Sequence, residues 1–133
     1  KRVSVGMTPG THGSTLGGNP LAMAVGNGVL DIILQDGFLD NVKKISKYFD
    51  QELISLKKKY SKVILEVRGR GLLKGLKLAV DNAKFIETLM KYKMLVVKAE
   101  EQVIRLFPAL IVSKKEINEA ISKIEQACKE YNN

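Results

Sequence analysis

The chain has 133 residues, of which 45% are hydrophobic, and its mean hydropathy is −0.04. These values are typical of about one ordinary globular domain and exclude an intrinsically disordered chain. No apolar run approaches the ~20 residues that span a bilayer, and no signal-peptide pattern opens the sequence, so we expect no membrane contact.

The formal net charge of +8 raises the possibility of a nucleic-acid partner. However, lysines are scattered over helix faces, and aromatic residues are not interleaved with them as stacking platforms. We therefore expect a solvated lysine-rich surface and no nucleic-acid partner. Arginine is scarce, and Arg68, Arg70 and Arg105 fall in apolar strand regions, which suggests that the planar guanidinium group matters there.

The chain has one cysteine and one histidine. Cys128 can form no internal disulfide, and its place on the apolar side of a helix predicts a buried structural thiol rather than a reactive one. His12 has no cluster of other ligands around it, so no metal site is expected. A reducing compartment, most simply the cytoplasm, fits this cysteine usage.

Residues 1–18 have little periodicity and are expected to form a loop. The segment from Thr11 to Pro20 reads THGSTLGGNP. Its hydroxyls, its glycines and the helix start at Asn19 and Pro20 favour binding of an anion such as a phosphate. A flexible connector is the alternative interpretation of the same composition.

Two helices are expected next. The first runs from Pro20 to a stop at Asp36-Gly37; it is apolar around most of its circumference, so we expect other elements to enclose it. The second, over residues 38–60, has one apolar stripe and an opposite face of lysines.

The remaining pattern predicts strands and two more helices. Residues 63–67 alternate as a strand, residues 68–71 (RGRG) form a turn, and residues 72–80 resume an extended run. Asn82 caps a short helix, residues 94–97 and 103–107 form two short strands, and Ser113 with Glu116 forms a capping box for a final helix. The order predicts an α+β layer, in which helices cover one face of a small, mostly antiparallel sheet.

Three motifs together resemble class III aminotransferases, which are pyridoxal-phosphate enzymes with the aspartate aminotransferase-like fold (fold type I). The motifs are GTHGSTLGGNPLA, EVRGRGLLKGL and VIRLFPALIV, in that order and ahead of a capped terminal helix. The branch of the family that uses N-acetylornithine resembles the chain most, and the resemblance covers essentially the whole chain.

This resemblance implies a domain organisation and a cofactor site. Residues 1–18 correspond to the end of the large cofactor domain, residues 19–36 to a linking helix, and residues 37–133 to the small C-terminal domain. Thr15 is implied to bind the phosphate of pyridoxal 5′-phosphate held by the neighbouring subunit, with Ser14 as a weaker second ligand, so active sites form in a homodimer. Gly17 and Gly18 are expected to serve backbone geometry.

Arg105 matches the arginine that, in this family, binds a substrate carboxylate such as that of glutamate or 2-oxoglutarate. A guanidinium on a strand can hold a carboxylate through two parallel hydrogen bonds; the alternatives are an internal ion pair or simple exposure at a strand edge. Arg68 and Arg70 are interpreted as structural or solvated charges, and His12 as a hydrogen-bonding loop residue.

The chain departs from the family pattern at Lys74, at Pro108-Ala109 and at residues 100–102 (EEQ), where relatives have an apolar residue, Pro-Pro and a glycine-containing turn. The Schiff-base lysine of the family lies upstream of the first motif, so we expect a C-terminal piece of a larger enzyme that is inactive alone. The intact protein would move an amino group between N-acetylornithine and 2-oxoglutarate in arginine biosynthesis. The alternative is a non-catalytic remnant or a stand-alone folding or dimerisation domain.

Overall fold

The computed structural model describes residues 4–8 and 10–131. By its internal contacts the chain divides into two units, Lys1–Phe38 and Leu39–Asn133, and each is described by itself. No single helix in the described part of the chain is long and apolar enough to cross a membrane, and α1 and α2 meet that test only as a bent pair.

The first unit contains the short helix η1 (Ser4–Gly6), a loop and the helix α1 (Pro20–Ile33). The predicted start of α1 is confirmed, because Asn19 Oδ1 accepts a hydrogen bond from the Ala22 N–H at 2.9 Å and Pro20 occupies the first helical position. The helix ends at Ile33, before the predicted stop at Asp36-Gly37. No residue of α1 is buried, so the expectation that other elements enclose it is not met within this chain.

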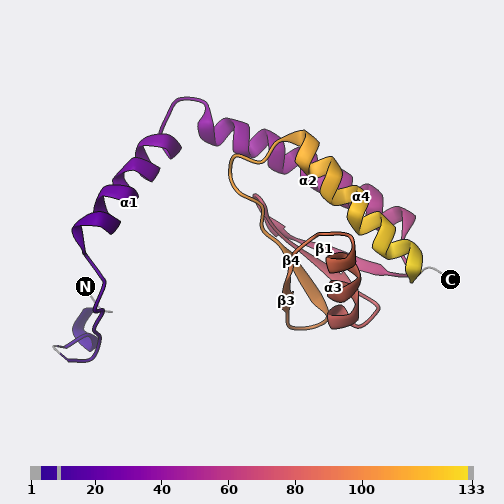
Figure 1. The fold of residues 1–133 in the computed structure, drawn as a ribbon, viewed down its shortest axis with the longest axis horizontal. Helices are drawn as coiled ribbons and strands as arrows, with labels where there is room; N and C mark the ends of the chain where they lie inside the picture. Colours follow the sequence, from indigo (N-terminus) through magenta and orange to yellow (C-terminus); the bar gives the residue numbers. More distant parts are fainter. Residues whose placement is uncertain (1–3, 9, 132–133) are drawn as a thin grey trace. The chain divides into compact units, whose positions relative to one another are not determined.

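The second unit is an α+β layer, as predicted (Figure 1). Its elements are α2 (Phe38–Lys59), β1 (Ile64–Arg70), β2 (Leu73–Leu78), α3 (Asn82–Lys91), β3 (Val97–Ala99), β4 (Val103–Leu106) and α4 (Lys114–Glu130). The four strands pair in the order β1-β2-β4-β3, and every neighbouring pair is antiparallel.

The core lies on one face of this sheet. Figure 1 shows α2 and α4 side by side over the sheet, and hydrogen bonds from Tyr48 to Asn118 (2.5 Å) and from Tyr60 to Glu125 (3.0 Å) join them. The fully buried side chains come from all three helices and from the strands: Phe49, Leu53, Ile64, Leu76, Leu78, Phe85, Leu89, Ile104, Ile117, Ile124 and Cys128. The opposite face of the sheet carries none of these side chains, and it is the face on which Arg105 lies.

The first hairpin is longer than predicted. Residues 68–70 belong to β1 and pair with β2, so the expected turn over residues 68–71 is wrong; the chain reverses at Gly71 and Leu72. Gly69 misled the prediction because glycine usually marks a turn. Here it is required within the strand, since its φ is 120° and a Cβ atom would lie 2.1 Å from the carbonyl oxygen of Leu73.

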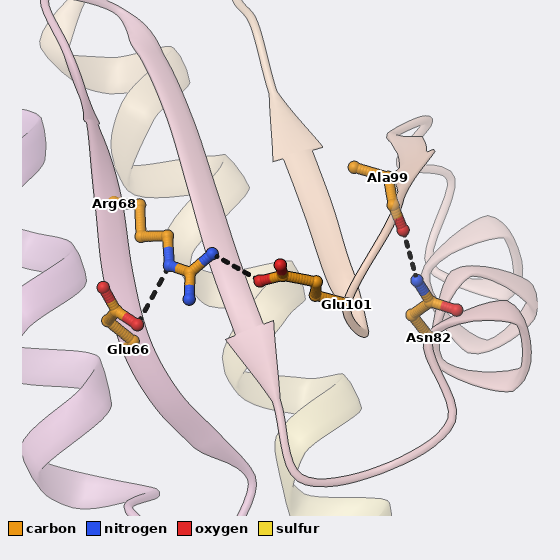
Figure 2. A network of polar contacts seen from close by, with 5 residues as sticks. All are labelled: Glu66, Arg68, Asn82, Ala99 and Glu101. Atoms are coloured by element: carbon orange, nitrogen blue, oxygen red, sulfur yellow. Dashed lines mark hydrogen bonds and ion pairs between the residues drawn. The ribbon is translucent and has the colours of Figure 1, made fainter.

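The start of α3 and its contact with the turn between β3 and β4 also differ from the prediction. Asp81 caps α3, with Oδ1 accepting from the Lys84 N–H at 2.9 Å, whereas Asn82 was expected in that role. The Asn82 side chain instead donates to the carbonyls of Ala99 (3.0 Å) and Val103 (3.1 Å), and so holds the turn between β3 and β4 (Figure 2). The capping box of Ser113 and Glu116 is present as predicted.

Candidate functional site

The hydroxyls of the first motif have different local surroundings. Thr11 Oγ1 donates to the carbonyl of Thr8 at 2.7 Å, so this hydroxyl is used within the loop. Ser14 and Thr15 are exposed, and among the described residues neither hydroxyl has a hydrogen-bond partner. These two side chains are therefore available to an external acceptor.

The backbone after Thr15 turns tightly into α1. A Cβ atom on Gly17 would lie 2.8 Å from Ser14 Oγ, and Gly18 has a φ of +75°. Asn19 Nδ2 donates to the carbonyl of Leu16 at 2.6 Å while its Oδ1 caps the helix. Glycine at position 17 thus lets the backbone approach the Ser14 side chain, and glycine at position 18 allows the positive φ, in line with the geometric role expected for both.

The electrostatic character of this loop suits an anion. The first thirty residues contain no Asp or Glu, and the first acidic side chain is that of Asp31. Two hydroxyl donors, the start of a helix and the lack of nearby negative charge in this sequence segment together favour a phosphate over a cation.

Arg105 lies on the face of the sheet opposite the helices. Its strand neighbours Ile104 and Leu106 are buried in the core, so the alternation of β4 turns Arg105 outward. Its side chain is exposed, and within the described ranges it makes no ion pair and no hydrogen bond. Of the two alternatives weighed from the sequence, the internal ion pair is thus not what the structure shows.

Arg105 shares a shallow hollow of about 140 Å³ with Arg68. Arg68 pairs in register with Gly75, and Gly75 pairs with Arg105, so the two arginines stand on the same face of the sheet with only a glycine between them. A larger residue in place of Gly75 would crowd this space, because a Cβ atom there would lie 3.1 Å from Val103 Cγ1.

Arg68 differs from Arg105 in having two carboxylate partners. Its Nε lies 2.9 Å from Glu66 Oε2 and its Nη1 lies 3.1 Å from Glu101 Oε2. Figure 2 marks both contacts with dashed lines. Glu101 and then Glu66 raise the pKa of the Arg68 guanidinium, while Arg68 lowers the pKa of the Glu101 carboxyl. The interpretation of Arg68 as a structural charge agrees with these contacts.

Sequence reasoning missed three residues of this face: Glu66, Gly75 and Glu101. The Glu66–Arg68 pair had a signal, because residues two apart on a strand share a face. The contact from Arg68 to Glu101 spans 33 positions and had no signal in the sequence.

The loop with Ser14 and Thr15 belongs to the first unit and Arg105 to the second, so the structure describes them as two separate parts.

Comparisons with known proteins cover most of both units. The class III aminotransferase family matches residues 1–128. An acetylornithine aminotransferase from Brucella melitensis is 50% identical over 122 residues, which are 92% of this chain and 30% of that protein. The acetylornithine aminotransferase of Agrobacterium fabrum is 48% identical over 122 residues, which are 92% of this chain and 31% of that protein.

A solved structure shows the same fold. The acetylornithine aminotransferase of Elizabethkingia anophelis superposes with a TM-score of 0.79 at 28% identity, covering 96% of this chain and 33% of that one. The chain thus spans about a third of the length of the relatives that it matches. It belongs to the class III aminotransferases, a family of pyridoxal-phosphate enzymes.

Proposed function

We propose that this chain is the C-terminal part of an aminotransferase that moves an amino group between N-acetylornithine and 2-oxoglutarate, as in arginine biosynthesis. Residues 1–18 are then the end of the large cofactor domain, residues 19–36 a linking helix and residues 37–133 the small domain. The similarity to acetylornithine aminotransferases at up to 50% identity supports this choice of substrate.

The single observation that carries the proposal is that Arg105 has no partner among the described residues, on a sheet face where Arg68 is paired with two carboxylates. A guanidinium without an internal carboxylate, held on a strand and open to solvent, is suited to take one from a substrate. Arg105 would bind a carboxylate of glutamate or 2-oxoglutarate through two charge-assisted hydrogen bonds and so orient the reacting carbon.

Pyridoxal 5′-phosphate fits the donor set of the loop. Thr15, with Ser14 as a second ligand, would hold the phosphate, since both hydroxyls are unused by described residues and no carboxylate occurs nearby in the sequence. When bound, the cofactor supplies the electron-withdrawing ring on which amino transfer depends. The lysine that anchors the ring would come from outside the 133 residues, so we expect this chain alone to be inactive.

We further propose a cytoplasmic homodimer in which Thr15 of one subunit serves the phosphate held by the other. A loop that presents two free hydroxyls on an exposed surface supports a ligand contributed from elsewhere. The buried Cys128, which forms no disulfide, supports a reducing compartment.

Two features of the sequence favoured the non-catalytic alternative: Lys74 and the altered turn over residues 100–102. The unusual Lys74 is paired with Asp50 at 2.5 Å, and the turn that lacks glycine is held by hydrogen bonds from Asn82 and by the ion pair of its Glu101 with Arg68. These two of the three departures from the family pattern are therefore accommodated in the fold, which supports the catalytic interpretation over the non-catalytic one.

The test uses the intact enzyme with its upstream residues. Arg105→Gln should raise the KM for 2-oxoglutarate about 30- to 150-fold, the equivalent of a lost charged pair of about 2–3 kcal/mol. Amino transfer from N-acetylornithine should be affected less in its own half-reaction. An unchanged KM for 2-oxoglutarate would remove Arg105 from the proposed site.

The cofactor role has its own matched pair of variants. Thr15→Val should weaken retention of pyridoxal phosphate on dialysis, whereas Thr11→Val should not, because the Thr11 hydroxyl is bonded to Thr8. The visible absorbance of the bound cofactor after dialysis reports both. Equal retention in the two variants would contradict a phosphate contact from Thr15.

A further inference from the structure

The face of the sheet opposite the helices carries a second guanidinium, that of Arg68, which is paired with two carboxylates. Arg68, Gly75 and Arg105 stand in one row across β1, β2 and β4. Adjacent strands lie about 4.8 Å apart, so the two arginine backbones are separated by about 10 Å. Because Gly75 has no side chain, two arginines at this distance could converge on one ligand in the hollow that both line.

The two carboxylates that bind Arg68 both lie on one side of this row. Glu66 pairs with Lys77, which pairs with Val103, and that next row is closer to the turn between β3 and β4. Glu101 lies in the turn itself. Figure 2 shows the Arg68 guanidinium between these two carboxylates, across β2. The ion pairs thus direct the Arg68 guanidinium toward the turn and engage its Nε and Nη1 atoms.

The position of Glu101 is itself tightly defined. Glu101 and Gln102 are consecutive residues with positive φ, 57° and 60°, a conformation that non-glycine residues rarely adopt. Gln102 Oε1 accepts from the Asn82 N–H at 2.9 Å, and Asn82 binds the carbonyls on either side of the turn. The turn therefore fixes the backbone of Glu101 through bonds that do not involve Arg68, while the Glu101 carboxylate itself binds Arg68.

We propose that Glu101, with Glu66, determines substrate specificity by masking Arg68, that is, by pairing with its guanidinium. Among the described residues, the only guanidinium in the hollow that can then bind a carboxylate ligand is that of Arg105. This inference rests on the proposed role of Arg105. Without the two glutamates, Arg68 would be a second carboxylate-binding group facing Arg105 across Gly75. The enzyme would then bind short dicarboxylates more tightly at this site, including ones that do not react.

The experiment measures competitive inhibition by glutarate, an unreactive dicarboxylate, against 2-oxoglutarate in the intact holoenzyme. Glu101→Gly is the first variant, because glycine readily adopts a φ of 57° and the Asn82 and Gln102 bonds remain. The inhibition constant of glutarate should fall about two- to fivefold, the scale of one exposed charged pair. Adding Glu66→Gln should lower it further.

Two controls separate masking from simple charge removal. Glu87→Gln removes an equal charge from an exposed position on α3 that has no ion pair among the described residues, and it should leave the inhibition constant unchanged. Adding Arg68→Gln to Glu101→Gly restores the original net charge and should abolish the gain. If the gain persists without Arg68, or if Glu101→Gly produces none, the proposal is wrong.

Failure of this proposal can be told from failure of the proposed function. If Arg105→Gln raises the KM for 2-oxoglutarate while Glu101→Gly leaves glutarate inhibition unchanged, only the masking is refuted. If Arg105→Gln has no effect on that KM, the carboxylate site itself is misplaced and the masking falls with it.

Discussion

Lys74 is the residue at which this chain departs most clearly from an apolar core. Its side chain is 2% exposed, on the same sheet face as the buried Leu76 and Leu78, and it reaches Asp50 on α2 at 2.5 Å. A buried ammonium needs such a partner, because removing it from water costs several kcal/mol. Asp50 itself remains 40% exposed, so water continues to solvate that end of the pair.

The pair predicts unequal effects of its two partners on stability. Asp50→Ala leaves an unpaired buried charge and should lower the free energy of unfolding by about 1–3 kcal/mol, less than for a fully buried pair because Asp50 is partly solvated. Lys74→Met replaces the charge by an apolar chain of similar length and should be neutral or stabilising. Urea unfolding of both variants measures the difference; equal losses would contradict this account.

These residues also show what a sequence can and cannot predict at this scale. The family pattern predicted an apolar residue at position 74, and the structure places Lys74 on the core side of β2. Its partner lies 24 positions earlier on another element, and no local pattern indicates it. The same holds for Arg68 and Glu101, so the sequence identified the arginines of the face but not the carboxylates that distinguish them.

Among the elements, α4 contributes the only cysteine to the core. Cys128 has no exposed surface, and burial raises the pKa of its thiol to about 12. The thiol of the unfolded chain ionises near its ordinary pKa of about 9. Between these two values the unfolded state loses its proton while the folded state keeps it, so folding becomes less favourable as pH rises.

We therefore expect an alkaline loss of stability that depends on Cys128. Above pH 9 the thiol should contribute a fall in the free energy of unfolding of up to about 1.4 kcal/mol per pH unit. Cys128→Ala should show a shallower decline over the same range, apart from a constant offset for the lost side-chain volume. Urea unfolding at several pH values between 8 and 10.5 tests this, and parallel curves for the two proteins would refute it.

Helix starts were predicted better than strand ends, for a physical reason. The caps at Asn19 and at Ser113 depend on contacts within three residues, so their signals are local. Strand β3 begins at Val97, where it was expected to end, because its extent depends on pairing with β4 and on the Asn82 bonds. Such pairing is set by residues far away in the sequence.

At the scale of the whole molecule, the two units differ in what stabilises them. The second has a continuous buried core drawn from three helices and the sheet. The first buries nothing on α1, and several large apolar side chains of that helix are more than half exposed, such as those of Leu21 (75%), Val25 (58%) and Leu30 (52%). An apolar surface of this kind is usually covered by another part of a protein or by a partner.

This contrast predicts that residues 37–133 fold independently of the first unit. Because α1 buries no side chain, deleting residues 1–36 should leave the midpoint and the free energy of urea unfolding unchanged, while α2 stays whole. If the exposed apolar side chains of α1 make the full 133 residues associate, the shortened chain should stay monomeric at the same concentrations, as sedimentation velocity would show. A clear loss of stability on deletion would mean that the first unit packs against the core, and the apolar face of α1 would then be an internal contact rather than one that the rest of the enzyme provides.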